Sequence, residues 1–218
     1  MKSFAVIGLG RFGTEVAKSL AELGNEVLAI DRDPEAIKDV SSLVTYAVEA
    51  DVMDEGVLKE LGISNMDAVV VSIGSNLEAS VMATLLSKEI GVKRILAKAQ
   101  TKLHGRLLKK IGADRIIYPE IEMGNRVAHN LTSKNILDYI ELSPEFSIIE
   151  LNALEKWVGK SLKTLRLRNK YGVNVIAIKK DEKINISPRS EDTIEEGDII
   201  IIIGSLDDIK NIEMRVGD

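Results

Sequence analysis

The sequence of 218 residues contains no cysteine and is poor in aromatic residues and histidine. The lack of cysteine excludes disulfides, thiolate nucleophiles and thiolate metal sites, and it fits a reducing, cytoplasmic location. No stretch approaches the ~20 consecutive apolar residues of a membrane-spanning helix. The apolar segment 3–9 is too short for a signal peptide and soon runs into glycines. We therefore expect any role at a membrane to depend on docking to another protein.

The two histidines, His104 and His129, fall within helical patterns and have no partner at a catalytic spacing. Residues distant in the sequence could still form a catalytic site in the folded protein. The absence of an evident catalytic acid or base nevertheless argues against an enzyme. The formal net charge is −5, whereas a nucleic-acid-binding surface needs clustered Lys and Arg. The composition therefore favours a non-enzymatic protein with no nucleic-acid partner.

The strongest positive feature is a Gly-x-Gly-x-x-Gly turn, Gly8 to Gly13, which follows an apolar strand and precedes a helix. Gly8 allows a sharp turn, Gly10 allows backbone N–H groups to approach a phosphate, and Gly13 allows the helix to pack on the sheet. The N-terminus of that helix points its partial positive charge at the phosphate. This pattern predicts a dinucleotide-type binding site.

The acid expected to hold the ribose is Asp31, which ends the second strand 18 residues beyond Gly13. The alternative is an ordinary polar residue that closes a strand. A carboxylate suits a ribose with a free 2′-hydroxyl better than one with a 2′-phosphate. Arg32 could pair with a 2′-phosphate, so a ligand of that kind stays an alternative.

Apolar runs alternate with helical patterns over the first 120 residues, which predicts a Rossmann-type, doubly wound parallel sheet. The expected strands lie near 3–8, 26–31, 44–49, 67–73, 93–98 and 115–118, with helices near 12–23, 34–40, 53–61, 76–90 and 102–111. Residues 121–143 are expected to form a helical connector or dimerisation region, with helices over 120–130 and 133–139.

Residues 144–218 carry short strands and turn signals, which predicts a small α+β domain. Strands are expected at 146–152, 173–180, 183–187 and 198–203, with a small helix over 159–169. The isoleucine-rich strand in Thr193–Gly204 reads as buried on both faces, as it would be at a subunit interface.

Several charged residues occur where the ligand edge of the sheet is expected. Arg11 lies in the phosphate turn, at the positive N-terminal end of the helix dipole. A cation there is repelled by the dipole unless an anion lies between them, so Arg11 either faces a bound anion or is a solvated charge. Lys98 ends the fifth strand and is open to the same two interpretations. Glu120 either binds Mg²⁺ at the phosphates or caps the next helix. Asp51 follows the third strand, where an adenine would lie. The full set of predicted cofactor-binding residues is Gly8, Gly10, Arg11, Phe12, Gly13, Asp31, Arg32, Asp51, Val52, Ser72, Ile73, Gly74, Asn76, Lys98 and Glu120.

These motifs resemble the RCK proteins, the cytoplasmic regulatory subunits of Ktr/Trk-type bacterial potassium transporters, and the Ktr type most closely. The resemblance covers nearly the whole chain. It rests on Gly8-Leu-Gly-Arg-Phe-Gly13, Lys98-Ala-Gln100, Ile111-Gly-Ala-Asp-Arg115, Pro119-Glu120 and Asp192-x-Ile-x-x-Gly-Asp198.

The resemblance implies a sensor that switches between ATP- and ADP-bound states, with NAD(H) as a further possible ligand. It implies an octameric ring, built from dimers, on the inner face of the membrane beside a potassium-conducting subunit. Arg11 would reach the γ-phosphate, also from a second subunit, and Glu120 would bind the divalent cation. Close relatives often carry Asn where this chain has Asp51. Two alternative functions stay open: a small NAD(H)-dependent oxidoreductase, and a soluble nucleotide-binding protein with no channel partner. The resemblance also implies a cyclic di-AMP site in the C-terminal domain, at Arg168, Asn174, Val175, Ile176 and Pro188.

Overall fold

The computed structural model describes residues 1–54, 56–132, 135–143 and 145–216. The chain divides into two compact units, residues 1–121 and 122–218, and each is described by itself. Among the described residues, no helix is long and apolar enough to cross a lipid bilayer.

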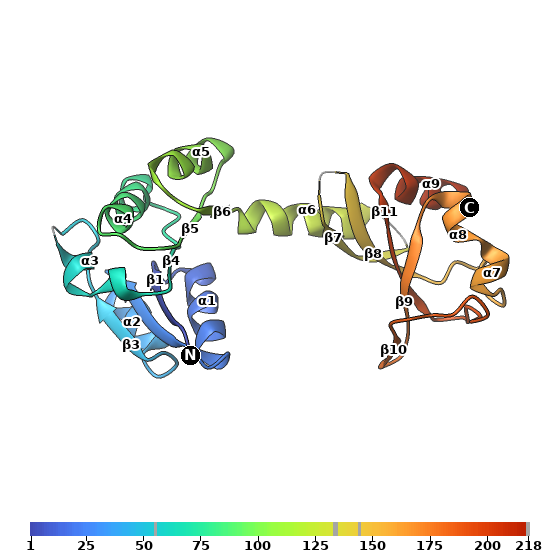
Figure 1. The fold of residues 1–218 in the computed structure, drawn as a ribbon, viewed down its shortest axis with the longest axis horizontal. Helices are drawn as coiled ribbons and strands as arrows, with labels where there is room; N and C mark the ends of the chain where they lie inside the picture. Colours follow the sequence, from blue (N-terminus) through green and yellow to red (C-terminus); the bar gives the residue numbers. More distant parts are fainter. Residues whose placement is uncertain (55, 133–134, 144, 217–218) are drawn as a thin grey trace. The chain divides into compact units, whose positions relative to one another are not determined.

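The first unit is a six-stranded parallel sheet in the order β3-β2-β1-β4-β5-β6, with helices packed against it (Figure 1). This order confirms the Rossmann-type fold, because the strand order reverses between β1 and β4. The strands are β1 (Ser3–Ile7), β2 (Glu26–Asp31), β3 (Tyr46–Glu49), β4 (Ala68–Val71), β5 (Ile95–Lys98) and β6 (Arg115–Ile117). The helices are α1 (Arg11–Glu22), α2 (Pro34–Val40), α3 (Val57–Glu60), α4 (Leu77–Glu89) and α5 (Lys102–Ile111), with a 3₁₀ turn at Ile63–Asn65.

The sequence explains the main boundaries of these elements. All four residues of β4 are buried, as expected for a central parallel strand covered on both faces. Helix α4 begins where the Asn76 side chain accepts a hydrogen bond from the Ala79 N–H, and Thr101 caps α5 in the same way through the His104 N–H. These caps start both helices just beyond the carboxyl ends of β4 and β5, which leaves the intervening loops at one edge of the sheet.

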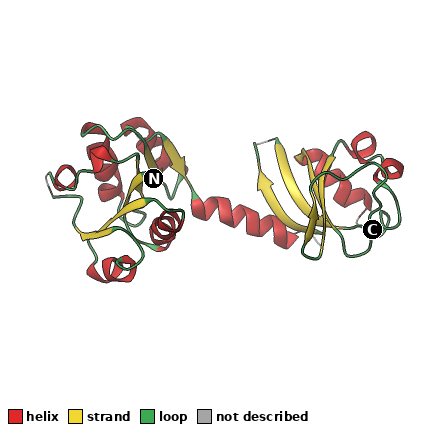
Figure 2. Cartoon of the chain, turned by 60° about the horizontal axis from the view of Figure 1, so that its bottom comes forward, coloured by secondary structure: helices red, strands yellow, loops and turns green. Residues whose placement is uncertain are grey.

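The second unit contains a five-stranded antiparallel sheet in the order β10-β9-β11-β8-β7, with helices beside it (Figure 2). Its core includes Trp157, Ile194, Ile200 and Ile202, which are almost completely buried. The unit confirms the small α+β domain. Its strands are β7 (Ile136–Glu141), β8 (Phe146–Asn152), β9 (Asn174–Lys180), β10 (Lys183–Asn185) and β11 (Ile199–Ser205). Its helices are α7 (Leu162–Leu165), α8 (Leu167–Tyr171) and α9 (Leu206–Val216). Helix α6 (Pro119–Thr132) spans the boundary between the units.

The predicted helical connector over 121–143 is wrong beyond Thr132, because β7 occupies residues 136–141. Residues 133–134 lie outside the described residues. Strand β7 pairs antiparallel with β8, and the phenol oxygen of Tyr139 accepts a hydrogen bond from the buried Ser147 hydroxyl. This cross-strand pairing is a long-range interaction, and it outweighs the helical pattern in the local sequence. The dimerisation role of this region stays a prediction.

The prediction that the isoleucine-rich strand is buried on both faces is wrong within one chain. Burial alternates along β11: Ile200 and Ile202 are fully buried, whereas Ile199, Ile201 and Ile203 are partly exposed. A uniform run of isoleucines hides the period of two that normally reveals the buried face of a strand. Helix α9, which follows directly, was missing from the predicted elements.

Candidate functional site

A cleft of about 270 Å³ opens at the carboxyl edge of the parallel sheet, beside the point where strand order reverses between β1 and β4. Open α/β sheets bind ligands at such a position. The cleft combines backbone from the glycine turn with acidic, cationic and amide side chains. It is lined by Ile7, Gly8, Gly10, Phe12, Ile30, Asp31, Arg32, Ala50, Asp51, Val52, Ser72, Ile73, Gly74, Ser75, Asn76, Ala79, Lys98 and Gln100.

The glycine turn is built as its sequence predicts. Gly8 has a φ of 92°, which an L-residue with a side chain rarely adopts. A Cβ atom at Gly13 would lie 1.9 Å from the Gly8 carbonyl oxygen, so only glycine permits this close packing of α1 on the turn. At Gly10, which lines the cleft, a Cβ would meet nothing within 4 Å. The backbone is thus free to approach a phosphate at Gly10.

The Asp31 carboxylate is held by two backbone donors. Oδ2 accepts a hydrogen bond from the Leu9 N–H at 2.5 Å, and Oδ1 accepts one from the Asp33 N–H at 2.9 Å. These bonds tie the glycine turn to the end of β2 and orient the carboxylate at the cleft. Each oxygen retains a lone pair that can accept a hydrogen bond from a ribose hydroxyl.

Asp51 presents a second carboxylate in the same cleft. Its Oδ1 accepts a hydrogen bond from the Met53 N–H at 2.9 Å, a bond that orients the side chain just beyond β3. A carboxylate only accepts hydrogen bonds, so Asp51 suits the exocyclic amino group of an adenine.

Lys98 carries positive charge into the cleft and pairs with Glu120 at the start of α6. Lys98 Nζ lies 2.5 Å from Glu120 Oε1, and it lies 5.8 Å from the centre of the Phe12 ring. The Lys98 side chain is only 11% exposed, whereas that of Glu120 is 63% exposed. The hydrogen bond from Lys98 holds the pKa of Glu120 below its usual value, so this carboxylate stays ionised.

Ser72 supplies a buried hydroxyl that has no hydrogen-bond partner among the described residues. Its oxygen lies 2.8 Å from the place that a Cβ at Gly13 would occupy, close to the phosphate turn. A buried hydroxyl without a partner is costly, so this group is well suited to donate to a ligand.

Most predicted cofactor-binding residues meet in this one cleft. Only Arg11, Gly13 and Glu120 do not line it. Gly13 acts through packing, Glu120 reaches the cleft through Lys98, and the Arg11 side chain is exposed to solvent. The lining residues that the sequence interpretation missed are Ile7, Ile30, Ala50, Ser75, Ala79 and Gln100. Gln100 and Ser75 were detectable, because Gln100 follows Lys98 at a strand end and Ser75 lies between Ser72 and Asn76. Ile7, Ile30 and Ala50 lie at or next to strand ends, and Ala79 lies on α4.

The described residues contain no cluster of three or more acidic, histidine or cysteine side chains that could hold a metal ion. Glu120 offers one carboxylate, which suits Mg²⁺ only where phosphate oxygens and water complete the coordination. The role of Glu120 as a metal ligand stays a prediction.

A second cavity, of about 230 Å³, lies in the second unit between α7, α8 and β9. Four of the five residues predicted for a second ligand line it: Arg168, Asn174, Val175 and Pro188. The fifth, Ile176, does not line the cavity; it sits at a bulge, where the register on β11 skips from Ala177 to Val175. The remaining lining residues are Leu162, Arg166, Leu167, Val173 and Ser190.

Comparison with known families matches both units. Residues 4–119 match the TrkA-N domain and residues 146–217 match the TrkA-C domain. The chain is 47% identical over 215 residues to Ktr system potassium uptake protein C of Bacillus subtilis (strain 168), covering 99% of this chain and 97% of that protein. It is 39% identical over 210 residues to Ktr system potassium uptake protein A of Vibrio alginolyticus, covering 96% of each.

Among solved structures, the RCK domain of GsuK aligns with a TM-score of 0.70 and 16% identity. The match covers all of this chain and 48% of that chain. At this identity the likeness concerns the fold alone. The relatives and the family models together show that this chain belongs to the TrkA-N/TrkA-C family of RCK proteins, as a Ktr-type subunit.

Proposed function

We propose that this chain is the regulatory subunit of a potassium transporter and that ATP and ADP compete for the cleft at residues 8–13. The full-length relatives are named as potassium uptake proteins. The observation that carries the ligand proposal is the joining of the glycine turn, two carboxylates and Lys98 in one cleft. Asp31 would hold the ribose, Asp51 the adenine amino group, and Gly10 with Ser72 the phosphates.

A ligand shifts a conformational equilibrium only through its different affinity for the two states. ATP and ADP differ by one charged phosphoryl group, so the residues that meet this group must supply the difference. A coupling of about 1–3 kcal/mol per site is typical of allosteric proteins, and several sites in one ring would add to a large shift in population.

Arg11 is the proposed γ-phosphate residue. Its side chain is exposed and does not line the cleft of its own chain, which fits a contact to the nucleotide of a second subunit. An arginine can bind a phosphate through two hydrogen bonds. The Arg11 proposal therefore also requires self-assembly, for which a dimer-based octameric ring is the proposed form.

Glu120 is the proposed Mg²⁺ ligand beside the phosphates, with the rest of the coordination from phosphate oxygens and water. The ion would neutralise phosphate charge next to this carboxylate. A bound Mg²⁺ would compete with Lys98 for Glu120, since Lys98 is its partner in the structure.

The second cavity is proposed to bind cyclic di-AMP. It offers the guanidinium groups of Arg166 and Arg168 for phosphate and the aliphatic side chains of Val175 and Pro188 for a base. Calorimetry with cyclic di-AMP tests this proposal separately from the nucleotide cleft.

The partner is proposed to be a membrane-embedded potassium-transporting subunit, against which this chain would act from the cytoplasmic side. Co-purification of the full chain with that subunit, and its mass in solution, test the partner and the ring. Family membership favours this role over the NAD(H)-dependent oxidoreductase.

The central test is calorimetric titration of the full chain with ATP, ADP, NAD⁺ and NADH. We expect ATP and ADP to bind competitively, and the Arg11→Ala variant to lose affinity for ATP while it keeps that for ADP. Binding of neither adenine nucleotide would refute the proposed function. Equal loss of ATP and ADP affinity in the variant would refute the γ-phosphate role alone.

A further inference from the structure

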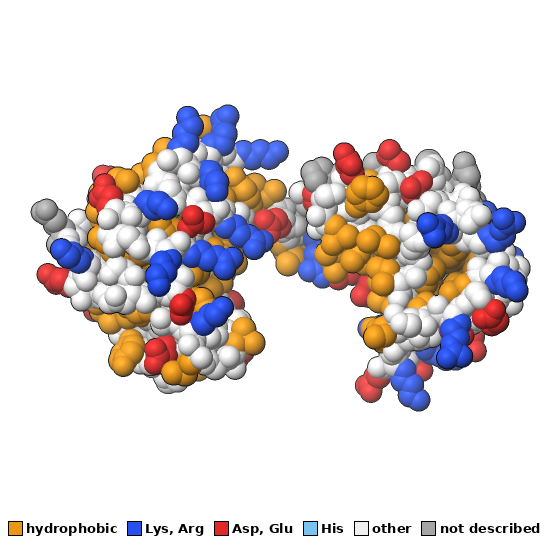
Figure 3. Space-filling view, in the orientation of Figure 1, with side chains coloured by type: hydrophobic (Ala, Val, Ile, Leu, Met, Phe, Trp, Pro, Cys, Tyr) orange, Lys and Arg blue, Asp and Glu red, His pale blue; other side chains and the backbone are white. Residues whose placement is uncertain are grey.

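Positive charge is concentrated in one short part of the first unit. Residues 88–115 contain nine of the 29 Lys and Arg residues of the chain but only two of its 34 acidic residues. The net charge of −5 conceals this asymmetry, because the acids lie elsewhere in the sequence. Figure 3 shows Lys and Arg side chains gathered over the part of the first unit that holds α5.

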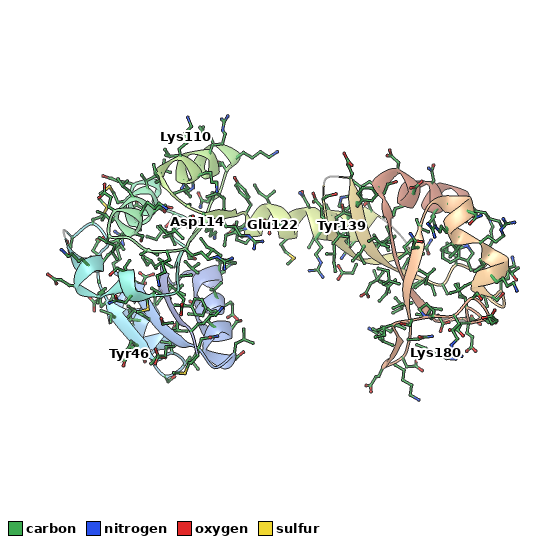
Figure 4. The ribbon with its side chains drawn as sticks, viewed as in Figure 1. Tyr46, Lys110, Asp114, Glu122, Tyr139 and Lys180 are labelled. Carbon is green, nitrogen blue, oxygen red and sulfur yellow. The ribbon has the colours of Figure 1, made fainter. Side chains whose placement is uncertain are left out.

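The topology brings six of these cations to one edge of the sheet. Lys93 and Arg94 directly precede β5, and Arg115 begins the neighbouring parallel strand β6. Parallel strands begin at the same edge, so this edge lies opposite the nucleotide cleft, which opens at the strands' carboxyl ends. The last turn of helix α5 lies at this edge and contains Lys109 and Lys110; Figure 4 labels Lys110.

Lys88 belongs to the same cluster, because its side-chain carbons lie against Gly112. A Cβ at Gly112 would lie 2.6 Å from Lys88 Cγ. We refer to Lys88, Lys93, Arg94, Lys109, Lys110 and Arg115 as the basic edge. All six residues are exposed.

No ion pair among the described residues neutralises the basic edge. None of its six cations takes part in an ion pair with another described residue. Lys109 donates to the backbone carbonyl of Asp114 at 2.7 Å, and the Asp114 carboxylate accepts a hydrogen bond from the Ile95 N–H. Glu89 is the second acid of the segment. Asp67, which directly precedes β4 beside β5, adds a third acid at the same edge, so six cations there face three acids.

From this arrangement we infer that the basic edge binds an anionic phospholipid surface. Exposed cations attract anionic membranes through their summed charge and need no pocket. The cleft of the first unit, the cavity of the second unit and the cavity lined by Lys102, Arg106, Tyr118 and Ile121 include none of the six residues. The edge has no aromatic residue for stacking on bases, which disfavours single-stranded nucleic acid.

This inference is independent of the nucleotide site, because the basic edge and the cleft lie at opposite ends of the strands. The test is co-sedimentation of the full chain with vesicles of phosphatidylcholine, with or without phosphatidylglycerol, in the absence of nucleotide and transporter. We expect binding only to vesicles that contain phosphatidylglycerol, and its loss at high salt.

The decisive variant is Lys93→Gln with Lys110→Gln, since neither side chain makes a hydrogen bond or ion pair with another described residue. Each Lys near an anionic membrane contributes roughly a fivefold gain in binding, so the double variant should bind about twenty-fivefold more weakly. Lys38→Gln with Lys59→Gln is the matched control, because these lysines are also exposed but lie on α2 and α3. Lys93→Arg with Lys110→Arg should keep the binding.

Three results would overturn the inference: no binding to phosphatidylglycerol vesicles, equal loss in the test and control variants, or binding that persists at high salt. If the Lys93→Gln with Lys110→Gln variant loses binding to the transporter subunit in detergent but binds vesicles as before, the basic edge binds an acidic protein surface instead. Circular dichroism of each variant checks that the fold is unchanged.

Discussion

The ammonium group of Lys98 reaches from the cleft to a carboxylate oxygen of Glu120, 2.5 Å away. Lys98 ends β5, and Glu120 is the second residue of α6. A phosphate in the cleft would offer Lys98 a competing anionic partner. Binding of a phosphate group in the cleft would therefore be linked to the first turn of α6 through one cation.

The first prediction separates the two partners of Lys98. Lys98→Gln should weaken ADP binding by roughly ten- to hundredfold, because a hydrogen bond to a charged group contributes about 1.5–3 kcal/mol. Glu120→Gln should strengthen it a few-fold when Mg²⁺ is removed by a chelator, since Lys98 then loses its competing carboxylate. Calorimetry measures both. If Glu120→Gln weakens ADP binding under these conditions, the competition is wrong.

The second prediction concerns pH and the buried His104. Burial lowers the pKa of His104 from its ordinary value of 6.5, and its Nε2 has no partner among the described residues. The unfolded chain therefore binds a proton more readily than the folded chain as pH falls below 6.5. This contribution to the stability is fully present above pH 6.5 and decreases towards lower pH.

His104→Leu should remove that part of the pH dependence and leave the stability at neutral pH unchanged or higher by about 1 kcal/mol. Urea denaturation at neutral pH and at about pH 5.5 measures the effect. The ion-paired Asp138 does not account for a pH dependence in this range. Arg126 holds the pKa of this carboxylate below its usual range, so Asp138 titrates at lower pH than His104. An unchanged pH dependence in the variant would contradict the assignment to His104.

The third prediction distinguishes two glycines of one turn. Gly13→Ala should lower the unfolding free energy by about 1–3 kcal/mol, because its Cβ would lie 1.9 Å from the Gly8 carbonyl oxygen. Gly10→Ala should leave the stability within about 0.5 kcal/mol, because this position is open and has an ordinary φ of −64°. Gly10→Ala should nevertheless weaken nucleotide binding by blocking the approach of phosphate.

Thermal denaturation and calorimetry test this pair of variants together. Equal stability of the two would show that Gly13 is not required for packing. Unchanged nucleotide affinity in Gly10→Ala would place the phosphate away from this part of the turn.

The sequence predicts most residues of the cleft in the first unit, because the central features of this cleft are local. Gly8, Gly13 and Asp31 lie within one βαβ unit, and their spacing alone defines a turn, a helix contact and a strand end. The pairing of Lys98 with Glu120 is different. Both residues were predicted for the site, but their contact depends on how β5 and α6 are placed in the folded unit.

The errors occur where long-range pairing decides the structure. Residues 136–141 have an acceptable helical pattern, and they become β7 only because β8 supplies a partner strand. The isoleucines of β11 carry no alternation that could identify the buried face. The basic edge was missed for a related reason: a net charge does not reveal where on the fold the charges gather.

The last prediction concerns Arg166, which lines the second cavity with a left-handed backbone φ of 48°. This conformation disfavours residues other than glycine. Arg166→Gly should therefore raise the stability by up to about 1 kcal/mol, or roughly 2–4 °C in Tm, while it weakens the binding of cyclic di-AMP. Arg168→Gly lies inside the short helix α8 and should lower the stability by about 1 kcal/mol. If Arg166→Gly is stabilised, Arg168→Gly is destabilised and both lose ligand affinity, the strained backbone of Arg166 serves binding rather than folding. If Arg166→Gly is instead destabilised, the arginine side chain supports the fold.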